Sequence, residues 1–257
     1  MKGVRRLLVV LPVAALLLGV VVLPATAKQP TNVVFTPVIR GYMNALGSGT
    51  PAGPARAEKL TQPGSYAAVY THSVRGVDQA AADSGQPLPA TTPTFSAAKG
   101  RASLCSGTPP TCIVFSSFVV KGGKITDFKR NGNGFVGALS AGDGTSHDAL
   151  GSSLTVIGAY MPDPSQLIVD VAVKNGDHQL TFNFAGTYIG SDGHQVQSSQ
   201  SLIATTDLRP GSSAALTFVF QGVTVGGSVI VKCLNPATTL PADYIAETQM
   251  PVPVFQP

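Results

Sequence analysis

Apolar and polar positions alternate with a period of two through much of the second half of the chain. The segment QLIVDVAVK (166–174) places Asp170 and Lys174 on one face and four apolar side chains on the other: Leu167, Val169, Val171 and Val173. The segments QLTFNF (179–184), SAALTFVF (213–220) and GSVIVKC (227–233) repeat this pattern, with turn-forming sequences between them. The alternation predicts short antiparallel strands with one covered face and one face in water.

A helical period replaces this pattern near the middle of the first half. In SYAAVYTHSVRGVDQAAADSG (65–85), apolar side chains recur at spacings of four, four, three and four: Tyr66, Tyr70, Val74, Val77 and Ala81. This stripe predicts a helix that begins after Ser65 and stops near Gly85. Further on, CIVFSSFVV (112–120) and KITDF (124–128) flank a Gly-Gly pair, which is typical of a tight β-hairpin.

The ends of the chain differ from both patterns. Residues 1–27 combine a basic start, the apolar stretch 7–23 and the sequence Ala25-Thr26-Ala27, as expected of a cleaved signal peptide. The apolar stretch is close to the lower length limit for a membrane-spanning helix, so a retained anchor is the alternative, and we expect membrane association only in that case. Residues 28–62 carry scattered Pro and Gly, and the end of the chain is rich in Pro.

These patterns predict a mainly β protein with five segments. They are a signal peptide (1–27), an extended lead-in (28–62), a small helix-plus-β-hairpin module (63–148), an immunoglobulin-like antiparallel β-sandwich (149–235) and a proline-rich tail (236–257) that lies along the surface or stays loose. The sandwich is expected because about seven short strands fit between residues 153 and 234.

The charge of the chain does not point to a nucleic-acid partner. The formal net charge is +4, with 17 basic and 13 acidic residues. Three of the basic residues, Lys2, Arg5 and Arg6, belong to the predicted signal peptide, so the mature chain has 14 basic residues and a net charge of +1. No cluster of Lys and Arg interleaved with aromatic residues remains in it, and we therefore expect no binding to nucleic acid.

Several strand and turn sequences resemble a known group of proteins. The segments LIVDVAVKNGDHQLTF, IGSDGHQVQ and LRPGSSAALTFVF are similar to the extracellular immunoglobulin-like domains of secreted actinobacterial proteins of unknown function, among them small mycobacterial secreted immunogenic antigens. The segment TCIVFSSFVVKGGKITDF resembles a module found upstream in such proteins. The resemblance implies a fold and an extracellular setting, and it supplies no active-site residues.

Three cysteines are the first candidates for chemistry. Cys105 and Cys112 do not form a C-x-x-C motif, and no nearby ligand pair completes a zinc site. In an oxidising compartment we expect them to form a disulfide around Thr108-Pro109-Pro110. Cys233 shares strand parity with Val229 and Val231, which predicts a free thiol buried in the core. The alternatives are a reactive or intermolecular thiol at Cys233, or a bridge from Cys233 to one of the other two cysteines.

The histidines and acidic residues give no second candidate. His72 is expected on a solvated helix face, and His178 and His194 in turns at opposite ends of the sandwich. Ser146-His147-Asp148 are neighbours in sequence, whereas the side chains of a hydrolytic triad come from separate elements. The loop 143–148 is expected to be solvated. Weak calcium binding is the alternative, and it is less favoured because the loop does not match the twelve-residue calcium loop. No pair of acids stands out for glycoside hydrolysis.

The sequence therefore favours a secreted, non-enzymatic binding or structural protein, extracellular or envelope-associated, with an unknown protein or glycan as partner. No catalytic, cofactor-binding or metal-binding residue is assigned, and no cofactor is expected. One alternative is a secreted hydrolase acting on cell-wall or extracellular polymer, which a cleft between the two modules lined by converging Asp or His side chains would favour. The other is a secreted protein inhibitor that acts through a protruding Cys105–Cys112 loop.

Overall fold

The computed structural model describes residues 34–257 apart from 84, 86, 183–185, 204–206 and 235–244, so the predicted signal peptide lies outside the described residues. Three helices come first and strands follow, which confirms a mainly β protein. The helices are α1 (Pro37–Leu46), α2 (Ala52–Glu58) and α3 (Tyr66–Asp83). The strands are β1 (Thr94–Ser96), β2 (Arg101–Ser106), β3 (Thr111–Lys121), β4 (Lys124–Arg130), β5 (Leu139–Ser140), β6 (His147–Ala149), β7 (Ser152–Asp163), β8 (Gln166–Lys174), β9 (Leu180–Phe182), β10 (Thr187–Ile189), β11 (Gln195–Gln197), β12 (Gln200–Ile203), β13 (Asp207–Leu208), β14 (Ser213–Gln221), β15 (Gly227–Leu234) and β16 (Ile245–Val252).

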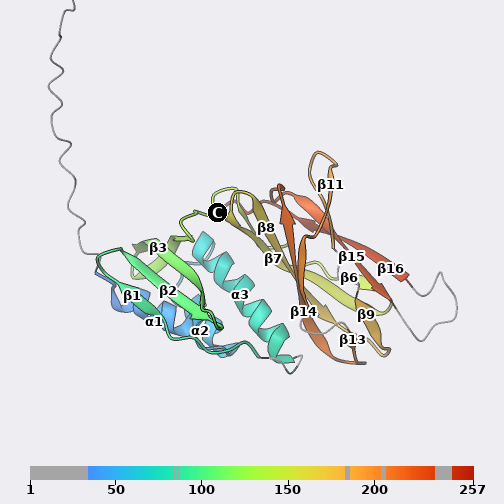
Figure 1. The fold of residues 1–257 in the computed structure, drawn as a ribbon, viewed down its shortest axis with the longest axis horizontal. Coiled ribbons are helices and arrows are strands. Elements are labelled where there is room, and N and C mark those ends of the chain that lie inside the picture. The colour runs from blue at the N-terminus through green and yellow to red at the C-terminus, as the bar shows by residue number, and fades with distance from the viewer. Residues whose placement is uncertain (1–33, 84, 86, 183–185, 204–206, 235–244) are drawn as a thin grey trace, which may run out of the picture. The chain divides into compact units, whose positions relative to one another are not determined.

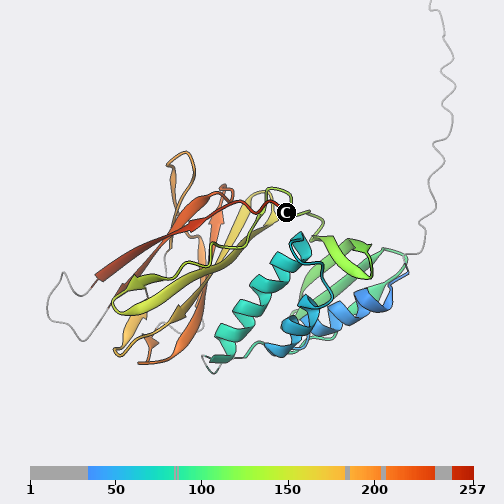
Figure 2. The same cartoon turned by 180° about the vertical axis from the view of Figure 1, so that it is seen from behind.

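The strands among the described residues form three antiparallel sheets. The four-stranded sheet has the order β1-β2-β3-β4. The middle sheet has the order β12-β14-β8-β7-β5, with β6 paired to β7. The far sheet has the order β11-β10-β15-β9-β13, with β16 paired to β15. In both views, α3 lies between the four-stranded sheet and the strands β7, β8 and β14 of the middle sheet (Figures 1 and 2).

The middle and far sheets enclose one hydrophobic core. From β8 it contains the four apolar side chains that the alternation assigned to one face, Leu167, Val169, Val171 and Val173, all of them almost fully buried. From β14 it contains Leu216, Phe218 and Phe220. The strand parity inferred from the sequence is therefore confirmed on this face of the middle sheet. A second core lies between the helices and the four-stranded sheet.

The expectation of an extended lead-in is wrong for residues 37–46 and 52–58, which form α1 and α2. Thr36 caps α1 by accepting a hydrogen bond from the Ile39 amide at 3.4 Å, and Pro37 occupies the first turn, where its missing N–H costs nothing. Ile39, Tyr42, Met43 and Leu46 form the buried stripe of α1. The scattered Pro and Gly residues obscured this helical pattern in the sequence. The helices are stable because their apolar sides pack into the second core.

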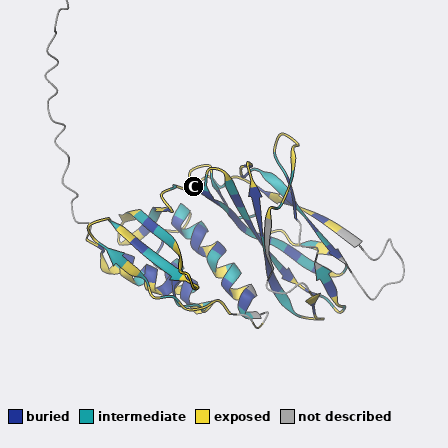
Figure 3. Cartoon of the chain, in the orientation of Figure 1, coloured by how far each residue is buried: buried dark blue, intermediate teal, exposed yellow. Residues whose placement is uncertain are grey.

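The structure confirms the predicted helix α3 and explains the glycine inside it. A Cβ atom at Gly76 would lie 2.2 Å from Cγ2 of Ile157 on β7, so the glycine lets α3 approach the middle sheet closely. On the same strand, a Cβ atom at Gly158 would lie 2.7 Å from Oγ of Ser73 on α3. Figure 3 shows α3 as largely buried or partly buried. Both glycines therefore fix how the helix lies on the sheet.

The helix-plus-hairpin module is larger than predicted. The hairpin of β3 and β4 is present, and Gly122 and Gly123 form its turn at positive φ. Strands β1 and β2 extend it to four strands, and α1 and α2 add helices to it. The tail is also not simply loose or superficial, because β16 pairs with β15 along eight residues and buries Met250 and Val252 in the core.

Candidate functional site

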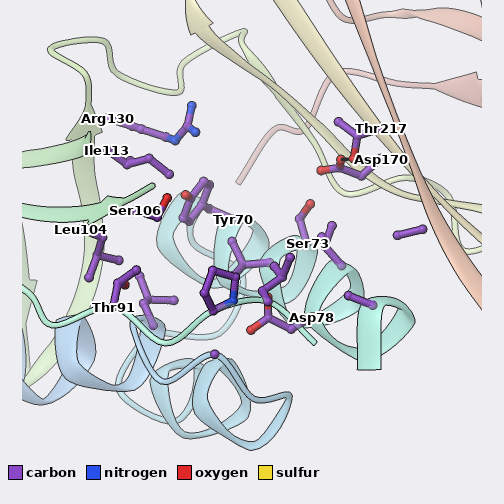
Figure 4. A pocket seen from close by; sticks show the side chains of 18 of the residues that line it. Tyr70, Ser73, Asp78, Thr91, Leu104, Ser106, Ile113, Arg130, Asp170 and Thr217 are labelled. Atoms are coloured by element: carbon purple, nitrogen blue, oxygen red, sulfur yellow. Dashed lines mark hydrogen bonds between the residues drawn. The ribbon is translucent and has the colours of Figure 1, made fainter. Parts of the chain in front are cut away.

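A cavity of about 720 Å³ lies between α3, the β2–β3 hairpin and the middle sheet. One wall is mostly apolar and includes Val74 and Val77 from α3 and Leu104 and Ile113 from the four-stranded sheet. The size is that of a pocket for a drug-sized molecule. In Figure 4, Tyr70 and Ser73 project from α3 between Arg130 on one side and Asp170 with Thr217 on the other. We call this cavity the interlayer pocket.

Arg130, the last residue of β4, brings a positive charge into the interlayer pocket. Its guanidinium carbon lies 4.5 Å from the centre of the Tyr160 ring, a cation–π contact, and the residue is only 6% exposed. Its Nε and Nη1 atoms are buried without a hydrogen-bond partner. Burial opposes the charge, but the neighbouring Tyr70, Tyr160 and Asp170 outweigh it and raise the pKa of Arg130. Arg130 therefore remains a cation.

Asp170 brings a carboxyl group to the opposite wall. It pairs across the strands with Thr217, whose Oγ1 donates a hydrogen bond to Oδ1 of Asp170 at 2.7 Å. The residue is 4% exposed, because α3 covers this face of the middle sheet. Burial raises the pKa of Asp170 to about 6, against the opposing effects of the Thr217 hydrogen bond and the charge of Arg130.

Helix α3 adds two further polar groups. Asp78 is 6% exposed, and burial raises its pKa to about 6. Ser73 is almost fully buried, and its Oγ has no hydrogen-bond partner. Unpartnered buried polar atoms are rare in folded proteins and call for an explanation. Both Ser73 and Arg130 line the interlayer pocket, so their missing partners coincide with space that a ligand could fill.

The predicted disulfide is present beside this pocket. Cys105 and Cys112 are joined across the β2–β3 hairpin with an S–S distance of 2.10 Å. Their neighbours Ser106 and Thr111 line the pocket, so the covalent link holds part of its wall together. Cys233 is a free, fully buried thiol in the core between the middle and far sheets. Burial is the main cause that raises its pKa to about 11.

The four histidines lie apart from the interlayer pocket. His72 lies on the exposed face of α3, where its Nδ1 is 3.2 Å from Oε1 of Glu58. His178 contacts Asp177, with 2.6 Å between Nδ1 and Oδ1, and His194 is exposed in a turn. His147 begins β6, and its Nε2 is buried without a partner. Within residues 34–257, as far as they are described, no three His, Cys, Asp or Glu side chains come close enough to hold a metal ion.

The sequence patterns did not single out Arg130, Asp170 or Asp78. The alternation predicts that Asp170 lies on a solvated strand face, and this prediction is wrong because α3 covers the face. One signal was present: Asp is disfavoured in the middle of a strand, and here it interrupts a run of apolar residues.

Comparisons with known protein families, curated proteins and solved structures found no match for this chain. In the part of the chain that the structure describes, no helix has the length and apolar character needed to cross a membrane.

Proposed function

We propose that this chain is a secreted, non-enzymatic binding protein that holds a small, largely apolar molecule in the interlayer pocket. The observation that carries the proposal is the coincidence of the pocket with the unpartnered, buried donors of Arg130. A closed structural core would be filled by side chains and would pair its polar atoms. Here both conditions fail at the same place.

The shape and lining of the pocket favour a compact ligand over a polymer. Its apolar wall suits an aliphatic or ring-containing body, and the few polar groups are placed as in sites that fix a ligand's orientation. We therefore prefer a small apolar molecule to the protein or glycan partners expected from the sequence.

Two further parts of the proposal concern setting and fold. The signal-like sequence at residues 1–27 and the Cys105–Cys112 disulfide support an extracellular location. The middle and far sheets, packed around one core, support an immunoglobulin-like sandwich as in the secreted actinobacterial proteins that the sequence resembles.

An enzyme is the second candidate, and one observation favours it. Asp78 and Asp170 line the same pocket between the helical module and the middle sheet, and burial raises the pKa of each to about 6. Such carboxyl groups suit acid–base catalysis near neutral pH. Binding is preferred because the pocket offers an apolar wall and no activated nucleophile among its described residues.

The test is whether an apolar probe binds in the pocket, and whether a larger side chain in the pocket weakens that binding. The full-length gene is expressed in a secreting host, and the protein is purified from the medium, where an intact mass that starts at Lys28 supports secretion. The neutral fluorescent probe N-phenyl-1-naphthylamine is then titrated into the wild type. We expect saturable binding at one site, and at least about tenfold weaker binding, or about 1.4 kcal/mol, in Val77→Trp.

The matched control is Val136→Trp, since Val136 is 80% exposed and does not line the pocket. It should bind the probe as the wild type does, and circular dichroism checks that both variants fold. Absence of saturable binding in the wild type, or equal binding by Val77→Trp, contradicts the proposal. Turnover of an ester or glycoside panel that Asp170→Asn abolishes would support the enzyme instead.

A further inference from the structure

Arg130 is a buried cation without a close counter-ion. None of the ion pairs among the described residues includes it. Its aromatic neighbours, Tyr70 and Tyr160, offer a ring face and a hydroxyl group but no negative charge while they stay protonated, and burial raises both of their pKa values. A buried charge is normally compensated by a partner of opposite charge, and the guanidinium of Arg130 lacks such a partner at close range.

Asp170 does not complete the charge pair. It interacts with Arg130 electrostatically, and Figure 4 shows the two side chains on opposite sides of the pocket. The contact of its carboxyl group within the protein is the hydrogen bond from Thr217. Nε carries one N–H and Nη1 carries two, so three donors of Arg130 remain for an acceptor inside the pocket.

We propose that the ligand is an amphiphile whose anionic head group, a carboxylate or a phosphate, accepts hydrogen bonds from Arg130 while its apolar body lies along the wall of α3 and the β2–β3 hairpin. This inference rests on the proposed function, because it names the ligand class for the same pocket. Hydrogen bonds between arginine donors and anionic oxygens are roughly twice as strong as those between neutral groups. The apolar wall, with Val74, Val77, Leu104 and Ile113, supplies the complementary surface.

The two acids in the pocket limit how the head group can be bound. Asp78 and Asp170 repel an anion when they are ionised, and burial raises the pKa of each to about 6. At pH 6 each carboxyl is therefore about half neutral, whereas an alkyl carboxylic acid, which resembles Glu with a pKa of about 4.3, is ionised. The binding experiment belongs at this pH.

The experiment compares head groups on one alkyl chain. Decanoate, monodecyl phosphate, 1-decanol and decylamine each displace N-phenyl-1-naphthylamine from the wild type, from Arg130→Met and from Arg75→Met. Methionine keeps an unbranched side chain that reaches about as far as the Nε position, but it removes the guanidinium with all its donors and its contact with the Tyr160 ring. Arg75 lies half exposed on α3, where its Nη1 is 3.0 Å from Oε2 of Glu58, and it serves as the matched control because it does not line the pocket.

We expect decanoate or monodecyl phosphate to bind the wild type at least about tenfold more tightly than 1-decanol, and whichever is tighter identifies the head group. Arg130→Met should remove this preference and leave 1-decanol unchanged, which also shows that the variant folds. Arg75→Met should keep the preference.

Equal affinity for decanoate, phosphate and alcohol, or a preference that survives Arg130→Met, overturns the inference while the proposed function stands. Tightest binding of decylamine also overturns it and assigns the head-group contact to the carboxyls. If the neutral probe does not bind the wild type at all, the proposed function and this inference fail together.

Discussion

The substitution Asp170→Asn should stabilise the folded protein at neutral pH. Asn keeps the size of the side chain and an oxygen that accepts the hydrogen bond from Thr217, but it carries no charge. It therefore imitates the protonated form of Asp170. The comparison between the two proteins measures what the ionised carboxyl costs in its buried position.

The size of this effect follows from the pKa. Burial raises the pKa of Asp170 from 3.8 to about 6, and one pKa unit corresponds to about 1.36 kcal/mol, which gives about 3 kcal/mol. Well below pH 3.8 both the folded and the unfolded states are protonated, so the carboxyl costs nothing. As the pH rises to about 6, the unfolded state ionises first and stability is lost, and above that pH the full cost remains.

The assay is urea unfolding of the wild type and Asp170→Asn at pH 4 and pH 8. At pH 8 the unfolding midpoint of the variant should rise by about 1 M or more, since urea m values are about 1–3 kcal/mol/M. Near pH 4 the two midpoints should nearly coincide. A lower midpoint for the variant at pH 8 would refute the reasoning, because it would mean that attraction to Arg130 outweighs the cost of burial.

A second substitution on the same hairpin controls for the loss of charge alone. Asp163 is the last residue of β7. Its Oδ1 accepts hydrogen bonds from the hydroxyl and the amide of Ser165, and these bonds lower its pKa. The sign is therefore opposite, and Asp163→Asn should not stabilise the protein at pH 8. A gain equal to that of Asp170→Asn would show a general effect of net charge.

Two other predictions concern the covalent link and a buried hydroxyl. Replacing Cys105 and Cys112 by Ser should lower the free energy of unfolding by about 2–3 kcal/mol in urea unfolding, because the disulfide closes a short loop in the unfolded chain. Without reductant, the unfolded wild type should expose one thiol to alkylation. Three alkylated thiols would contradict the pairing. The Tyr188 hydroxyl donates to the Thr224 carbonyl at 2.8 Å and accepts from the Gly227 amide at 2.9 Å, so Tyr188→Phe should cost about 1–3 kcal/mol in the same assay, and an unchanged midpoint would contradict this.

The sequence predicted which faces of β8 and β14 enter the core, because a period of two is enforced wherever one face is buried. Val169 and Phe218 are fully buried, as their parity required, and the same parity places Cys233 among buried residues. The pairing of Cys105 with Cys112 was predicted from their spacing and the expected oxidising setting. The structure agrees with it, because the two residues are aligned across neighbouring strands.

What covers the other face of a strand is not a local property. Asp170 and Thr217 have the polar character of residues in water, and only the position of α3 makes their face buried. That position depends on a long-range fit of Gly76 against Ile157, which no periodicity in either segment expresses. Strand β16 was likewise not predicted, because the prolines of this segment indicated a loose tail. An edge strand can contain proline, and β16, with Pro251, is an edge strand of the far sheet.

The polar groups of the interlayer pocket lie where they lower stability. By the linkage argument, an ionised Asp170 costs the folded protein about 3 kcal/mol at neutral pH. The unpaired donors of Arg130 and the unpartnered hydroxyl of Ser73 add to this cost. Uncharged side chains of similar size would give a more stable fold at these positions. Proteins keep such arrangements mainly at sites where the polar groups have a task, and the grouping of all three around one cavity is therefore the strongest argument that the pocket binds a ligand.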